Sequence, residues 1–142
     1  MVIMIRIIDN IEAYEEWVVG LYQLHHQARV IFISGELGAG KSTFARIWLR
    51  CAGVVGHIKS PSFSIIETYD SPALGVVHHV DCYRLQSQDD LLSLGFDDFL
   101  ADHVIIEWPE RVFEGLISPD LKVTLEIIGL EKRRCSASIN ND

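Results

Sequence analysis

The strongest constraint on the fold is a glycine-rich run that reads Gly35-Glu36-Leu37-Gly38-Ala39-Gly40-Lys41-Ser42. It matches the pattern G-x-x-x-x-G-K-[ST], which cradles phosphates when it follows a strand and opens a helix. The glycines let the backbone adopt positive φ and approach phosphate oxygens closely. Successive amides at the start of a helix favour a bound anion. The run therefore predicts a nucleotide-binding phosphate loop (P-loop), the alternative being a chance glycine-rich turn.

The segments on either side of the loop have the periodicity that a P-loop requires. Residues 29–34 form a short apolar, β-branched run, which is typical of a buried strand. Residues 42–51 place Phe44 and Trp48 at helical spacing, and Gly53 follows as a stop. This strand–loop–helix context favours the functional interpretation of the motif.

The rest of the chain alternates between strands and helices early and forms hairpins later. Asp9-x-x-Glu12 resembles a capping box and predicts the start of the first helix. We expect strands over 2–8, 62–69, 74–81, 103–107, 121–128 and 133–139, and helices from 9 to about 26, from 87 to 95 and at about 97–101. This order predicts one α/β domain over residues 1–142, with a mixed sheet that is parallel at its centre, has antiparallel additions and is flanked by helices.

Composition and charge exclude several classes of protein. The 142 residues are 49% apolar and include 20 acidic against 12 basic side chains, for a net charge of −8. This acidity argues against nucleic-acid binding through a broad basic surface. Apolar runs are far shorter than the roughly 20 residues that span a bilayer, and the N-terminus lacks the cleavage site of a signal peptide. Cys51, Cys82 and Cys135 are widely spaced, so we expect reduced thiols in a cytoplasmic protein.

Two acids at strand ends are candidates for a magnesium site. Residues 76–80 lead into Asp81, and residues 103–106 lead into Glu107. In P-loop proteins an acid near the end of a neighbouring strand completes the metal site. Lys41 would reach the β- and γ-phosphates, and the Ser42 hydroxyl would ligate Mg²⁺. The spacing leaves open which acid holds the metal and which orients water, as well as a solvated role for each.

Other polar residues first suggest structural roles. His78 and His79 alternate across a predicted strand, so they face opposite ways and cannot chelate one metal together. The basic run 132–134 is either a solvated surface or a contact for a nucleotide or an acidic partner. Trp108 differs from these, because it directly follows Glu107 at a strand end.

Taken together, the motifs resemble those of the TsaE (formerly YjeE) family. The P-loop with Thr43 is followed by Ser60-Pro61-Ser62-Phe63, by His79-x-Asp81-x-Tyr83-Arg84-Leu85, and by Glu107-Trp108-Pro109-Glu110. The resemblance covers about Val30 to Glu110. It implies a bacterial, Mg²⁺-dependent ATPase of tRNA threonylcarbamoyladenosine biosynthesis. In that family the partners TsaD and TsaB transfer the threonylcarbamoyl group to adenosine 37 of tRNAs that read codons beginning with A.

The resemblance also implies roles for the central residues. Gly38 to Thr43 would bind the phosphates of ATP, within a cofactor-binding stretch from Gly35 to Thr43, and Lys41 would be a catalytic residue. Ser42 and Glu107 would hold Mg²⁺, and Asp81 would lie at the catalytic site. Ser42 stands where the family more often has Thr, and its hydroxyl can still ligate magnesium.

Further roles are implied at the edge of this site. Trp108 is similar to the family's tryptophan near the nucleotide, and residues 60–63 are similar to its mobile switch segment, with Ser62 in place of the usual Thr. Arg133 lies where the family often has a basic residue near the base. The N-terminal stretch 11–19 lacks the Glu-Thr and Leu-Gly pairs that help to place the nucleotide in family members.

The resemblance implies an ATPase that meets tRNA only indirectly, through its partner proteins, and that has no membrane partner. No arginine finger is evident in the motifs, so we expect slow hydrolysis that accelerates on assembly. A small-molecule kinase is an alternative, although Arg84, Arg46 and Arg50 are a thin set of cations for phosphoryl transfer. A second alternative is a regulatory module that binds nucleotide without useful hydrolysis.

Overall fold

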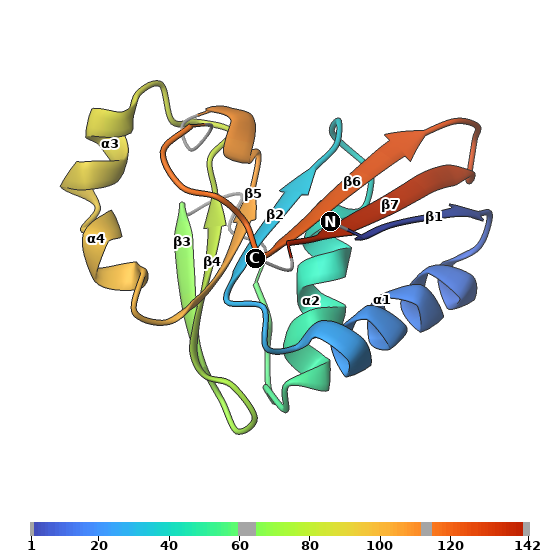
Figure 1. Cartoon of the computed structure of the whole chain (residues 1–142), viewed down its shortest axis with the longest axis horizontal. Helices are drawn as coiled ribbons and strands as arrows, with labels where there is room; N and C mark the ends of the chain where they lie inside the picture. Colours follow the sequence, from blue (N-terminus) through green and yellow to red (C-terminus); the bar gives the residue numbers. More distant parts are fainter. Residues whose placement is uncertain (1, 60–64, 112–114, 141–142) are drawn as a thin grey trace.

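The computed structural model describes residues 2–59, 65–111 and 115–140 (Figure 1). The elements follow in the order β1 (Val2–Ile8), α1 (Ile11–His25), β2 (Val30–Ser34), α2 (Lys41–Cys51), β3 (Ile66–Ser71), β4 (Gly75–Asp81), α3 (Gln88–Ser93), α4 (Phe96–Phe99), β5 (His103–Glu107), a 3₁₀ turn (Pro109–Arg111), β6 (Leu121–Ile127) and β7 (Arg133–Ile139). Strand–helix alternation thus occupies the first part of the chain and a hairpin ends it.

The strands form one mixed sheet in the order β1-β7-β6-β2-β5-β4-β3. Strand β2 pairs in parallel with β5 and with β6, and β4 pairs in parallel with β5. The pairs β1–β7, β6–β7 and β3–β4 are antiparallel. The predicted architecture, with a parallel centre and antiparallel additions, is confirmed. In this arrangement β2, β4 and β5 all end at the same edge of the sheet.

Helices cover both faces of the parallel centre. Figure 1 shows α1 and α2 together on one face, with α3 and α4 at the opposite side of the molecule, and the buried residues of α3 and α4 pack with those of β4 and β5. In strand β2, Ile31 and Ile33 point into the core under α1 and α2, whereas Val30 and Phe32 point into a second core with Leu91 of α3. Burial on both faces explains why this strand is a continuous apolar run rather than an alternating one.

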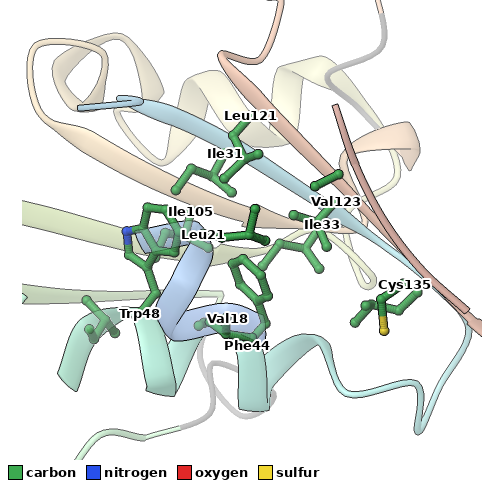
Figure 2. Close-up of a cluster of buried hydrophobic side chains, with 14 of the residues drawn as sticks. Val18, Leu21, Ile31, Ile33, Phe44, Trp48, Ile105, Leu121, Val123 and Cys135 are labelled. Atoms are coloured by element: carbon green, nitrogen blue, oxygen red, sulfur yellow. The ribbon is translucent and has the colours of Figure 1, made fainter. Parts of the chain in front are cut away.

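The larger core lies between the sheet and helices α1 and α2. Figure 2 shows Phe44 and Trp48 of α2 packed with Val18 and Leu21 of α1 against the strand side chains. Phe44 and Trp48 stack with ring centroids 5.7 Å apart, and Trp48 is 1% exposed. This core holds α2, and therefore the loop before it, against the edge where β2 ends.

Some predicted boundaries need correction. The helix cap is Asn10, not Asp9: the Asn10 side chain accepts from the Ala13 amide at 2.8 Å, and its backbone is extended (φ −150°) as a cap requires. Asp9 instead accepts from the Asn10 side chain at 3.0 Å. Strand β3 continues to Ser71, because Ser71 still pairs with Gly75 across the turn. The expected start of that strand, at 62–64, lies outside the described residues.

Two further features bear on earlier expectations. Among the helices in the described ranges, none is long and apolar enough to cross a membrane. Cys51, Cys82 and Cys135 are free thiols. Burial raises the pKa of Cys135 to about 11 and also raises the pKa of Cys82, so these two thiols stay protonated near neutral pH.

Candidate functional site

The glycine-rich run connects the end of β2 to the start of α2, as the motif requires. Gly38 and Gly40 adopt positive φ of 82° and 111°, a region that side chains disfavour. A Cβ atom on Gly35 would lie 2.6 Å from the Leu125 carbonyl oxygen of β6. These glycines are therefore required by backbone conformation at two positions and by close packing at a third.

Lys41 is the first residue of α2 and its side chain is buried, with 5% exposure. Its ammonium donates to the carbonyls of Gly35 at 2.6 Å and Glu36 at 2.9 Å, and it lies 4.4 Å from the centre of the Trp108 ring. Burial lowers the pKa of Lys41, and the nearby carboxylates of Glu107 and Asp81 oppose that shift. Lys41 thus lies among the loop carbonyls and the two strand-end acids.

Ser42 and Glu107 meet at the mouth of the loop. The Ser42 hydroxyl lies 3.2 Å from Oε1 and 3.1 Å from Oε2 of Glu107, whose side chain is almost completely buried. Asp81 is the register partner of Glu107 in the parallel β4–β5 pair. These are the hard oxygen donors that Mg²⁺ prefers, so the residues present fit a magnesium ion that also binds phosphates.

Asp81 has a different environment from Glu107. Burial raises the pKa of Asp81, and the Tyr83 amide, which donates to its Oδ1 at 2.9 Å, opposes the shift. Asp81 lines the same hollow as Lys41, at the carboxyl end of β4. The structure therefore brings both candidate acids to one side of the loop, as expected for parallel strands that end together.

His79 is a residue whose role the sequence did not reveal. Its Nε2 lies 2.5 Å from Oε2 of Glu107, and its exposure is 1%. His78 points to the other face, with its ring nitrogens 2.9 Å from Thr68 Oγ1 and 2.9 Å from Asp102 Oδ2. The two histidines diverge as the alternation predicted. The available signal was that His79 and Asp81, two residues apart on one strand, share a face.

Trp108 follows Glu107 in a strained backbone conformation. Its φ is +58°, a left-handed value that no other non-glycine residue in the described part of the chain adopts. Its ring lies against Tyr83, with centroids 5.0 Å apart, while Arg111 donates to the Tyr83 carbonyl at 2.9 Å. Such strain is retained where surrounding contacts hold the residue in place, and here it turns the indole over Lys41.

The P-loop separates two hollows. The smaller, of about 300 Å³, is lined by Leu37, Gly38, Gly40, Lys41, Ser42, Thr43, Asp81, Glu107 and Trp108. The larger, of about 410 Å³, is lined by Ile8, Asn10, Ile11, Glu12, Tyr14, Gly38, Ala39, Gly40, Thr43, Leu130, Glu131 and Arg133. The shared loop residues place the hollows next to each other, so a ligand with phosphates and a second moiety could occupy both.

The basic run 132–134 does not act as a unit. Arg133 donates to the carbonyls of Gly38 at 3.2 Å and Ala39 at 3.3 Å, whereas Arg134 pairs with Glu126 at 3.1 Å on the surface.

Tyr14 of α1, which sequence reasoning missed, donates to the carbonyl of Gly40 at 2.8 Å. The expected switch segment, 60–63, lies outside the described residues.

Comparisons with known proteins place the chain in a family. The family model described as Threonylcarbamoyl adenosine biosynthesis protein TsaE matches residues 8–135. A Rickettsia felis protein named tRNA threonylcarbamoyladenosine biosynthesis protein TsaE is 36% identical over 114 residues, which span 79% of this chain and 66% of that protein. The protein of the same name from Rickettsia typhi is 35% identical, over 79% of this chain and 78% of its own length.

The fold has a solved counterpart. The crystal structure of YdiB from Bacillus subtilis superposes with a TM-score of 0.74 and 22% identity, covering 99% of this chain and 88% of that one. This likeness supports the arrangement of the sheet and its helices. Since the family model matches most of the sequence, including the loop and both strand-end acids, the chain belongs to the TsaE family of threonylcarbamoyl adenosine biosynthesis proteins.

Proposed function

We propose that this chain is a Mg²⁺-dependent ATPase that supports formation of threonylcarbamoyladenosine at position 37 of tRNAs. The observation that carries the proposal is the contact of Ser42 with the buried Glu107, beside Lys41 in a P-loop. Membership of the TsaE family supports the pathway. The ATPase step rests on the chemistry of the site.

The smaller hollow would take the triphosphate and the larger hollow the nucleoside. The loop amides and the Lys41 ammonium would bind the β- and γ-phosphate oxygens. Ser42 and Glu107 would hold Mg²⁺, which when bound supplies charge neutralisation on those phosphates. Arg133, which lines the larger hollow, would lie near the base.

The site also suggests how the two acids divide their roles. Glu107 is engaged by Ser42 and His79, an arrangement suited to holding a metal in one place. Asp81 has a backbone amide at one oxygen, and it lines the hollow beside Lys41. We assign Glu107 to the metal and Asp81 to orientation of the attacking water.

Partner proteins of the TsaD and TsaB type would accelerate hydrolysis. No arginine is among the described residues that line the smaller hollow, so a charge that stabilises the transition state would have to arrive on assembly. With a net charge of −8, the chain would meet tRNA through those partners rather than by itself.

Phosphate release tests this proposal. We expect slow, Mg²⁺-dependent release by the chain alone, a rise of at least about tenfold with the TsaD–TsaB pair, since a supplied arginine finger is worth more than that, and background release by Lys41→Ala in both conditions. Equal rates with and without partners would contradict the assembly-dependent part. Transfer of phosphate to a small acceptor instead of water would favour the kinase alternative.

A further inference from the structure

The carbonyl groups on the outer side of the P-loop are held by side chains from two distant elements. Arg133, at the start of β7, donates from Nη2 to the Gly38 carbonyl and from Nε to the Ala39 carbonyl. Tyr14, in α1, donates its hydroxyl to the Gly40 carbonyl. Both side chains line the larger hollow, whereas Asp81 and Glu107 line the smaller one.

Holding these carbonyls determines where the loop amides point. The C=O of one residue and the N–H of the next belong to one planar trans peptide and point in opposite directions. The carbonyls of Ala39 and Gly40 face Arg133 and Tyr14, so the amides of Gly40 and Lys41 face the opposite side. Gly40 lines both hollows and Lys41 lines the smaller one, so we infer that these amides face the smaller hollow.

The Gly40 carbonyl has a second function in the backbone. It accepts from the Phe44 amide at 3.0 Å, the first hydrogen bond within α2. Gly40 caps this helix with φ +111° and has no capping side chain of its own. The Tyr14 hydroxyl therefore holds the carbonyl from which the helix starts, and it ties α1 to that point.

The surroundings of Tyr14 keep its hydroxyl in place and protonated, so that it can donate this hydrogen bond. Its side chain is 6% exposed, and its ring stacks on Trp17 with centroids 6.2 Å apart. Burial raises the pKa of the Tyr14 hydroxyl, which therefore stays protonated and keeps its donor. A Cβ atom on Gly40 would lie 3.4 Å from this hydroxyl, which shows how closely the ring approaches the loop.

We propose that Tyr14 and Arg133 are positioning residues for the phosphate loop: by holding its carbonyls outward, they orient its amides toward bound phosphates before the ligand arrives. This inference rests on the proposed function, since it concerns the same loop. The physical gain is preorganisation, because a loop already in its binding conformation loses less entropy when the ligand binds.

The test measures dissociation constants by calorimetry for Mg·ATP and for inorganic tripolyphosphate, which has no base or ribose. Tyr14→Phe keeps the ring and removes only the hydroxyl. We expect both ligands to bind about 3- to 10-fold more weakly, the range for one lost hydrogen bond. In hydrolysis assays KM should rise by a similar factor, with a smaller change in kcat. Tyr22→Phe, on the same helix but against Trp48, is the matched control and should bind as the wild type does.

Arg133→Lys tests the second contact. It keeps the positive charge and loses the planar fork that reaches two carbonyls. Weaker binding of both ligands would support positioning of the loop by Arg133. Weaker binding of ATP alone would mean that Arg133 acts on the nucleoside and not on the loop, and would overturn its role as a positioning residue.

Other outcomes separate this inference from the proposed function. If the wild type binds both ligands and Tyr14→Phe binds them within about twofold of it, the inference fails and the ATPase proposal stands. A lower melting temperature of Tyr14→Phe with unchanged dissociation constants would indicate a structural role only, and would also overturn the inference. A wild-type chain that binds neither ligand would overturn the proposed function together with this inference.

Discussion

At the scale of single residues, the site depends on buried polar groups that hold one another. Glu107 is 2% exposed and is reached by Ser42 from α2 and by His79 from β4. A buried carboxylate needs such partners, because an unpaired charge in the interior is strongly unfavourable. These contacts involve residues far apart in the sequence, which explains why the motif alone indicated Glu107 and not its dependence on His79.

Separate substitutions at the two acids test how their roles divide. Glu107→Gln keeps the shape of the side chain and loses the charge, so we expect at least about a tenfold loss of Mg²⁺-dependent ATP affinity. Asp81→Asn should bind Mg·ATP within about threefold of the wild type and lose at least about 100-fold in kcat, since a residue that orients water acts mainly in the transition state. Titration with ATP, with and without Mg²⁺, and single-turnover hydrolysis measure both. The reverse pattern would exchange the two assignments.

At the scale of elements, periodicity predicted most helices and strands, and local chemistry decided their ends. The first helix was expected from Asp9, but the polar pair at 9–10 offers two candidate caps. The extended backbone of Asn10 and its bond to the Ala13 amide select the second one. In contrast, the helix that was expected from 87 does start there, because Ser87 caps α3 and its side chain accepts from the Asp90 amide.

Paired alanine substitutions test this corrected cap. Asn10→Ala should lower the free energy of unfolding by about 1 kcal/mol, the usual cost of losing an N-cap. Asp9→Ala should cost less, because Asp9 accepts from the exposed side chain of Asn10 and caps no backbone amide in the described ranges. Urea unfolding monitored by circular dichroism gives both values. Equal losses of unfolding free energy, or a larger loss for Asp9→Ala, would mean that Asp9 and not Asn10 caps the helix.

At the scale of the whole molecule, sheet order assembles the site from both ends of the chain. The larger hollow is lined by Ile8 to Tyr14 near the N-terminus and by Leu130 to Arg133 near the C-terminus. They meet beside the loop because β1 pairs with β7, and β7 pairs with β6, which lies next to β2. The two chain ends meet beside the loop only when the chain is folded. A ligand of the site should therefore bind the native state rather than the unfolded chain, and stabilise it.

Thermal unfolding tests this coupling between ligand and fold. At a concentration about 100 times the dissociation constant, Mg·ATP should add about 2.7 kcal/mol of stability. In a domain of this size that raises the melting temperature by about 10 °C. Lys41→Ala should show less than half of the shift. An equal shift in both proteins would place the stabilising ligand outside the P-loop.

The sequence by itself determined the features that reside in contiguous residues. The loop from Gly35 to Ser42, the periodicity of its flanking strand and helix, and the mixed α/β class could all be predicted, because local backbone conformation and one buried face are sufficient to specify them. The family resemblance was likewise carried by short motifs, and the comparisons confirm it.

Only the tertiary structure decided what lies against those motifs. The sequence left open the side-chain partners of Glu107 and assigned no role to Tyr14, and it placed Arg133 near the base only through the family resemblance. Strand order and register brought His79 to Glu107, and brought Tyr14 and Arg133 to the loop carbonyls. The physical reason is that such contacts join residues tens of positions apart in the sequence. They are determined by the burial of whole faces of the sheet, and local conformational preferences do not determine them.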